Sequence, residues 1–329
     1  MEAPVKVSII VTCRNNAKTI AECLQALTDQ DYPNDAMEII VVDAFSTDGT
    51  ADIAKKYTSK VYIEPLNAPA AYNYAMKIAS HPVLGFVDSD AKVESAWLKK
   101  ITPRLAESRV AGVSGAIETW NAQNLWARSI GYELRNRYSR IGSYTGRIAT
   151  MNLLLKKSVI EEVGGWNEAM PSQYDTEFGY RLAQRGYRIA YESTAKCYHF
   201  NRQTLQAYWR QQLQYGKNTT RLYFMHGRLA RGDEITDVGM NIQPSLFLVV
   251  IAFFLLGVVP LLRLAWLVSG VVLAGMFVYY VYSAAKISAK FKDKTAMRLV
   301  VLYFVRTFAW LAGASAAALS FLSGGKSKP

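Results

Sequence analysis

Short apolar runs separated by polar segments dominate the first hundred residues. Three of these runs have the continuous apolar character of strands that are buried on both faces: residues 5–12 (VKVSIIVT), 37–43 (MEIIVVD) and 83–88 (VLGFVD). A further short strand is expected at 61–63, and helices are expected over 18–29, 51–57 and 70–80. Asp48 or Ser46 can cap the second of these helices. Strands and helices that alternate at this size predict a parallel, doubly wound sheet.

The pattern changes after residue 240, where apolar side chains dominate. A bilayer core of about 30 Å needs about 20 apolar residues in a helix. Three runs have this length: about 244–262, 264–285 and 299–322. Arg263 separates the first two, so they should form a tight hairpin. Helices inside a soluble core are the alternative, but these runs exceed the usual length of core helices.

The loop between the second and third runs sets the expected orientation. It contains five basic residues against the single acid Asp293: Lys286, Lys290, Lys292, Lys294 and Arg298. Positively charged loops stay in the cytoplasm. Three spans would then leave the N-terminal domain and this loop inside, and the Arg263 hairpin and the KSKP tail outside. The first residues have no signal-peptide pattern, so we expect an integral protein of the cell membrane with a cytoplasmic catalytic domain.

Arg306 interrupts the third apolar run. A charge at this depth is costly unless it snorkels, pairs or faces a polar cavity. A contact with a lipid phosphate is the functional interpretation of Arg306, and a snorkelling or paired structural arginine is the slightly favoured alternative.

Composition narrows the possible partners. The 329 residues include 38 Lys and Arg against 26 Asp and Glu, which gives a formal charge of +12. Because the chain has no nucleic-acid-binding signature, we interpret this excess as attraction to a membrane surface and to a pyrophosphate, with no nucleic acid as partner. Its three cysteines have neither disulfide nor zinc-site spacing.

Polar residues end three of the predicted strands. They are Cys13-Arg14-Asn15, Asp43 and Asp88-Ser89-Asp90. In open α/β sheets, ligands bind at the carboxyl ends of the strands, so these loops should converge on one crevice. Neither GxGxxG nor GxxxxGK[ST] is present, which argues against a dinucleotide site and a P-loop. Two carboxylates one residue apart in a turn can reach a hard cation, Mn²⁺ or Mg²⁺, that would neutralise a leaving pyrophosphate.

Five segments in this order resemble family 2 glycosyltransferases with the GT-A fold. They are VSIIVTCRN, IIVVDAFSTDGT, LGFVDSDA, VGGWNE at 163–168 and YDTEFGYRLAQRGYRI. The resemblance covers roughly residues 5–225 and extends to succinoglycan-type and lipid-linked-saccharide glycosyltransferases with C-terminal transmembrane helices. It implies a GT-A-type mixed, mainly parallel sheet, followed by interfacial helices and three transmembrane helices.

The resemblance also implies roles for individual residues. Asp175 would be the general base, and Asp90 and His199 would bind the metal. The donor would be bound by Thr12, Arg14, Asp43, Asp88 and Ser89. Contacts with the acceptor, or with the residues around the site, are assigned to Trp166, Glu177, Arg210 and Gln211. Structural alternatives remain open: Asp43 as a strand-end cap, Asp175 as a first-turn acid favoured by the helix dipole, and His199 as an ordinary structural histidine.

The implied activity is an inverting, metal-dependent transfer from a UDP- or GDP-sugar to a hydroxyl of a membrane-associated acceptor, such as a lipid-linked saccharide or a glycan. A polyprenyl-phosphate (dolichyl-phosphate) glycosyltransferase and a catalytically inactive synthase subunit are the alternatives. Three departures from related subgroups matter. Tyr174 replaces an acid before Asp175, Gln214 and Tyr215 replace the Arg-Trp of processive synthases, and AKVESAWL replaces the LQHPP of dolichyl-phosphate sugar synthases.

Three domains are expected. They are a catalytic domain at 1–200, an interfacial helical segment at 201–243 and a transmembrane domain at 244–329. The helix around 204–224 places Trp209, Tyr215 and Tyr223 among basic residues. This mixture suits a headgroup layer, and an ordinary solvated helix is the alternative.

Overall fold

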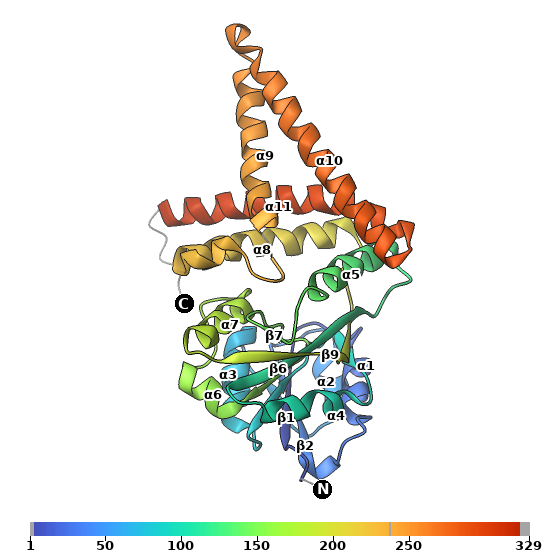
Figure 1. The fold of residues 1–329 in the computed structure, drawn as a ribbon. Helices are drawn as coiled ribbons and strands as arrows, with labels where there is room; N and C mark the ends of the chain where they lie inside the picture. Colours follow the sequence, from blue (N-terminus) through green and yellow to red (C-terminus); the bar gives the residue numbers. More distant parts are fainter. Residues whose placement is uncertain (1–2, 237, 323–329) are drawn as a thin grey trace. The chain divides into compact units, whose positions relative to one another are not determined.

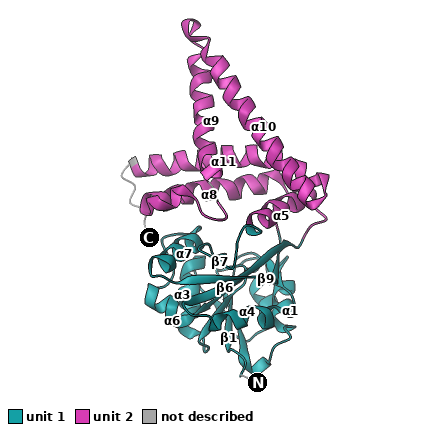
Figure 2. Cartoon of the chain, in the orientation of Figure 1, with its two compact units in different colours: residues 1–120, 138–200, 329 teal, residues 121–137, 201–328 magenta. Residues whose placement is uncertain are grey.

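The computed structural model describes residues 3–236 and 238–322, and the chain forms two compact units (Figure 2). The first contains residues 3–120 and 138–200, and the second contains residues 121–137 with the chain after residue 200. The predicted interfacial segment and the predicted membrane domain therefore lie in one unit. Residues 121–137 also belong to that unit. The KSKP tail, predicted to lie outside the membrane, falls outside the described residues.

The first unit is built on one mixed sheet in the order β3-β2-β1-β4-β8-β6-β9-β5, with β7 paired to β9 (Figure 1). Its strands are β1 (Val7–Cys13), β2 (Met37–Asp43), β3 (Val61–Ile63), β4 (Val83–Phe86), β5 (Ala91–Val93), β6 (Val110–Thr119), β7 (Tyr144–Thr145), β8 (Leu153–Lys156) and β9 (Arg188–His199). The pairs β1–β2, β1–β4, β2–β3 and β6–β9 are parallel, whereas β8 is antiparallel to β4 and β6. The predicted mixed, mainly parallel sheet is confirmed.

Alternation along β1 explains why its apolar residues occupy both faces of the strand. Ile9 and Val11 pack with α1 (Ile20–Thr28), whereas Ile10 packs with α3 (Ala68–Ile78) in a second core. Successive side chains of a strand point to opposite faces, so helices on both faces favour apolar residues on both sides of the strand. The other described helices of this unit are α2 (Thr50–Ala54), α4 (Trp97–Ile101), α6 (Lys157–Val163) and α7 (Tyr174–Gln184).

The N-cap position of α2 is occupied by Gly49 rather than by the predicted Asp48 or Ser46, and Asp48 lies next to it. Its carboxylate accepts hydrogen bonds from the backbone N–H groups of Thr50 (3.1 Å) and Ala17 (3.0 Å). Ser46 instead accepts a hydrogen bond from the Asn15 N–H at 2.8 Å. The contacts of Asp48 with Ala17 and of Ser46 with Asn15 connect the loop after β1 to the loop after β2.

The second unit is helical. Its described α-helices are α5 (Leu125–Tyr138), α8 (Leu205–Met225), α9 (Val238–Leu256), α10 (Ala265–Phe291) and α11 (Leu299–Leu322). Within the described residues, α9, α10 and the segment ending in α11 are long and apolar enough to cross a membrane. Helix α9 begins before and ends before the run predicted at about 244–262: Pro244 lies inside the helix, which ends at Leu256, before Gly257 and Pro260.

Arg306 is buried and paired inside this unit. It forms an ion pair with Glu133 of α5, and its Nη2 donates a hydrogen bond to Gln243 of α9 at 3.2 Å. Thr307 also contacts Gln243, and its hydroxyl lies 2.6 Å from that of Tyr280 on α10. The structure therefore shows the paired structural arginine, the favoured alternative from the sequence.

Candidate active site

The carboxyl ends of β1, β2 and β4 meet at one edge of the sheet. These strands are neighbours and run parallel, with Cys13 opposite Asp43 and Ile10 opposite Phe86. The polar loops that follow them therefore lie together, as the alternation of strands and helices predicts. Hydrogen bonds between Asn15 and the Ser46–Thr47 loop fix two of these loops against each other (2.8 and 2.9 Å).

Asp43 is fully buried at the end of β2. Its Oδ1 accepts the backbone N–H of Ser46 at 2.7 Å, and Oδ2 lies 3.4 Å from the Cys13 thiol. These contacts favour the strand-end alternative, in which Asp43 holds the turn; its contact with a nucleobase stays a prediction. The next residues present Phe45, 57% exposed and in the left-handed backbone region (φ 56°). Sequence reasoning missed this exposed aromatic ring.

The other predicted donor-binding residues differ in exposure. Arg14 is exposed and Thr12 half-buried at the end of β1, whereas Ser89 is buried in the loop after β4. The roles of all three residues stay predictions.

Asp90 and His199 lie side by side because of strand pairing. Ala91 of β5 is opposite His199 of β9, and the Phe200 N–H donates to the Asp90 carbonyl at 2.8 Å. This register brings His199 Nε2 within 3.4 Å of Asp90 Oδ1. A carboxylate and an imidazole at this separation can both bind one cation. Within the described residues, no three His, Cys, Asp or Glu side chains gather in one such group.

Asp88 is linked to the helix that contains Asp175. Thr150 Oγ1 donates to Asp88 Oδ1 at 3.2 Å and lies 3.5 Å from the Tyr174 hydroxyl. Burial, and then the charge of Asp90, raise the pKa of Asp88 to about 7, while the charge of His199 acts in the opposite direction. Such a displaced pKa is typical of functional sites. Thr150 gave no signal in the sequence, because its partner is 62 residues away.

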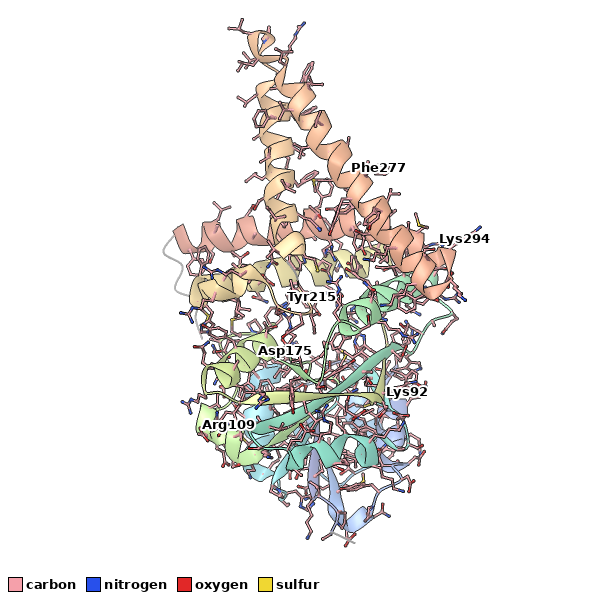
Figure 3. The ribbon with its side chains drawn as sticks, in the orientation of Figure 1. Lys92, Arg109, Asp175, Tyr215, Phe277 and Lys294 are labelled. Atoms are coloured by element: carbon pink, nitrogen blue, oxygen red, sulfur yellow. The ribbon has the colours of Figure 1, made fainter. Side chains whose placement is uncertain are left out.

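Asp175 occupies the first turn of α7 (Figure 3). Its Oδ1 accepts the backbone N–H of Thr176 at 2.7 Å. Burial raises the pKa of Asp175, and the charge of Arg147 partly opposes this shift. Arg147 is a third residue that sequence reasoning missed. Asp175 also contributes to the raised pKa of Asp88, so the two carboxylates are close enough to interact.

Trp166 is buried, with 2% of its surface exposed. Its ring stacks on Phe178 at 4.4 Å and packs against Phe86. Among the described residues its Nε1 has no hydrogen-bond partner. A direct contact of this side chain with the acceptor is therefore not supported, whereas the predicted alternative, a supporting position around the site, fits its burial.

Glu177 also supports the site from within the fold. It forms a bidentate ion pair with Arg181 (2.7 and 2.9 Å), whose guanidinium donates to the carbonyls of Val163 and Gly165. Glu177 thereby holds the glycine turn that precedes Trp166. The remaining predicted contacts, Arg210 and Gln211, lie on α8 in the second unit, and their roles stay predictions.

Comparisons with known proteins match this arrangement. A mannosyltransferase from Pyrobaculum calidifontis, solved in complex with GDP-Man and Mn²⁺, superposes with a TM-score of 0.60 at 20% identity over 98% of this chain and 89% of its own. At this identity the likeness shows the fold, and it confirms the GT-A-type sheet followed by helices.

Curated glycosyltransferases are similar in sequence to part of this chain. Glycosyltransferase AglE from Haloferax volcanii is 28% identical over 56% of this chain and 64% of its own length. Beta-monoglucosyldiacylglycerol synthase from Nostoc sp. is 26% identical over 54% of this chain and 41% of its own. The chain thus spans less than two thirds of the length of either relative. Residues 8–163, just under half of the chain, match the family model of glycosyl transferase family 2.

Proposed function

We propose that the chain is an inverting, metal-dependent glycosyltransferase that moves a sugar from a nucleotide-sugar to a hydroxyl group of a membrane-associated acceptor. The observation that supports this most is the joint placement of Asp90, His199 and Asp175 around the end of β4. A pair of metal ligands and a separate carboxylate are the groups that a single displacement requires.

The donor atoms of Asp90 and His199 fit a divalent cation. One carboxylate oxygen and one imidazole nitrogen leave several coordination positions for diphosphate oxygens and water. Of the two predicted ions, Mn²⁺ suits this set better, because Mg²⁺ prefers oxygen ligands in a strict octahedron. When bound, such an ion supplies charge neutralisation to the leaving nucleoside diphosphate.

Asp175 is the proposed base. The acceptor oxygen attacks the anomeric carbon, the bond from that carbon to the diphosphate oxygen breaks, and the leaving group takes its electron pair. The hydroxyl proton passes to the carboxylate of Asp175. A raised pKa suits this role, because a base works best when its pKa approaches the working pH. Attack and departure on opposite faces invert the anomeric configuration.

The acceptor is proposed to be attached to a lipid. The candidate spans of the second unit support a membrane location, and a name among the relatives, beta-monoglucosyldiacylglycerol synthase, points to a lipid acceptor. We propose that the protein is integral to the cell membrane and that its catalytic unit faces the cytoplasm, where nucleotide-sugars are available. The basic loop at 286–298 supports that orientation.

The test uses the full chain in lipid nanodiscs. Thermal shifts with UDP- and GDP-sugars, each with and without Mn²⁺, identify the donor. Labelled sugar from that donor is then offered to a membrane lipid extract, and the anomeric configuration of the product is determined. We expect binding that requires Mn²⁺ and a product of inverted configuration. Retained configuration, or full transfer in EDTA, would contradict the proposal.

A further inference from the structure

Helices α9 and α10 form an apolar hairpin. Figure 2 shows them standing together, joined by a short turn at residues 257–264. Large apolar side chains are exposed along both helices: Leu248, Phe254 and Leu255 on α9, and Leu267, Val271 and Val278 on α10. The 19 residues of α9 give a helix of about 28 Å, close to the hydrocarbon thickness of a bilayer. This hairpin has the length and surface of two membrane spans.

Helix α11 runs in a different direction. Within the second unit, α8 and α11 lie side by side across the base of the hairpin (Figure 2). A Cβ on Gly313 would lie 2.3 Å from the Leu213 carbonyl oxygen, and one on Gly216 would lie 2.5 Å from Trp310 Cα. The two backbones therefore touch. Farther along the same pair of helices, the ring of Phe224 contacts that of Phe321 at 4.8 Å.

Helix α8 is too polar to cross a bilayer. It exposes Arg210 and Lys217, and it buries Gln212 and Asn218. Each basic residue near the bilayer centre costs several kcal/mol. Since α11 packs against α8 from the Trp310–Gln212 hydrogen bond to the Phe321–Phe224 ring contact, the two helices must lie at a similar depth. A helix that follows α8 cannot span the hydrocarbon on its own.

The contacts of α11 with the hairpin extend from the start of α9 to the middle of both helices and do not include the turn at the tip. Arg306 and Thr307 bind Gln243, near the start of α9, and the ring of Phe308 lies 4.2 Å from that of Phe247. Phe304 meets Phe277 of α10, the residue labelled in Figure 3. Near the tip, Trp266 instead donates to the carbonyl of Phe254, which closes the hairpin on itself.

We infer that the second unit crosses the membrane only as the α9–α10 hairpin, and that α11 lies with α8 along the bilayer surface. The partner is a phospholipid bilayer with anionic headgroups. Segments 121–137 and 286–298, which belong to α5 and to the end of α10 with the following turn, contain eight Lys and Arg against two acids. Aromatic rings lie among these charges, with Tyr132 stacked on Phe291 and Arg135 over the same ring. This mixture suits a headgroup layer.

This inference changes the expected topology. Three spans place the C-terminus on the opposite side from the basic loop, whereas a hairpin with an in-plane α11 places both on the same side. It rests on the proposed membrane attachment but not on sugar transfer. The native Cys13, Cys23 and Cys197 are buried, so single introduced cysteines can report accessibility in the full chain.

The test uses three variants of the full chain, each with one introduced cysteine. They are Leu261→Cys at the hairpin tip, where Leu261 is 93% exposed, Lys294→Cys in the basic loop, and a cysteine appended after Pro329. Intact and permeabilised cells are treated with a membrane-impermeant maleimide, and transfer activity is measured separately. We expect Leu261→Cys to react in intact cells, and the other two to react only after permeabilisation.

Labelling of the appended cysteine in intact cells would establish α11 as a third span and overturn the inference. Failure of Leu261→Cys to react in intact cells, when it reacts after permeabilisation, would show that the hairpin does not cross. Loss of transfer with the expected labelling pattern would reject the proposed activity while leaving the topology intact.

Discussion

The two units treat buried charge in opposite ways. In the first unit, Asp88 and Asp175 are partly buried carboxylates, and burial raises the pKa of both. In the second unit, buried Arg306 has an ion pair with Glu133 and a hydrogen bond to Gln243. Burial of a charge is costly unless the charge is paired. The carboxylates of the first unit can therefore interact with a ligand or a proton. The charge of Arg306 in the second unit instead holds helices together through its ion pair and hydrogen bond.

This difference separates residues that should change the reaction from residues that should change stability. Substitutions at the end of β4 and the start of α7 should reduce transfer while the fold persists. Substitutions around Arg306 should lower stability first, and should reduce transfer only as the protein unfolds. Each prediction below tests one side of that distinction.

Loss of the metal site should have the largest effect. Asp90→Asn removes the charged ligand, and with it the neutralisation of the leaving diphosphate, which is worth several kcal/mol or about 10³-fold in rate. Single-turnover transfer, measured over a series of Mn²⁺ concentrations, should fall by at least that factor. Asp52→Asn is the matched control, because Asp52 is an exposed carboxylate on α2. Equal activity of Asp90→Asn and Asp52→Asn would remove Asp90 from the mechanism.

Asp175→Asn should reduce transfer by about 10²–10⁴-fold, the usual range for general-base catalysis. Donor affinity, measured by calorimetry with Mn²⁺ present, should stay the same, because the proposed base contacts only the acceptor. A collapse of donor binding would make Asp175 a donor contact or a structural residue. Transfer at the native rate would instead favour a phosphate acceptor, which is already ionised and gains little from a base.

The pH profile gives an independent check on Asp175. A base must be deprotonated to act, so the rate should fall as the pH drops below the pKa of this carboxyl. The ordinary pKa of an aspartate is about 4. Because burial raises the pKa of Asp175, the acid limb of the rate should lie above that value. The acid limb of single-turnover transfer should disappear in Asp175→Asn, and its persistence would assign the titration to another group.

Arg306→Met tests the second unit. It breaks the buried ion pair between Arg306 and Glu133, and removing one partner of such a pair typically costs about 3–5 kcal/mol. Thermal inactivation in nanodiscs should therefore occur at a lower temperature. The double variant Arg306→Met with Glu133→Leu removes both charges and should recover most of the loss. If the double variant is no more stable than the single one, the ion pair does not account for the burial of Arg306.

Local sequence patterns predicted the half of the site that depends on strand ends. The apolar runs at β1, β2 and β4 fix which residues follow each strand, so Asp43, Asp88 and Asp90 could be placed at one edge. The resemblance supplied His199, and the β5–β9 pairing explains why it reaches Asp90. The sequence and its family resemblance were therefore enough to predict that these residues lie together.

Long-range packing explains what the sequence could not predict. Thr150 reaches Asp88 across 62 residues, and Glu133 reaches Arg306 across 173 residues. The sequence pattern did not predict α5. The direction of α11 could not be predicted from its composition either, because α11 has the length and hydropathy of a membrane span. Its contacts with α8, rather than its apolar content, determine where it lies.

The smallest effect should come from a single methyl group between α8 and α11. A Cβ on Gly313 would lie 2.3 Å from the Leu213 carbonyl oxygen and 2.6 Å from the Lys217 nitrogen, both of which are backbone atoms that move only with their helix. Gly313→Ala should therefore force the helices apart, and overpacking of this kind costs about 1–3 kcal/mol.

Gly275→Ala on α10 is the matched control, because a Cβ there meets no atom within 4 Å. Alanine favours a helix over glycine by about 0.5–1 kcal/mol, so this variant should be as stable as the native chain or slightly more stable. Thermal inactivation of both variants in nanodiscs measures the difference. Equal stability of the two would show that α8 and α11 are not held in backbone contact, and the in-plane position of α11 would lose its main support. A loss confined to Gly313→Ala would instead establish that α8 and α11 are packed in backbone contact, which the in-plane position of α11 requires.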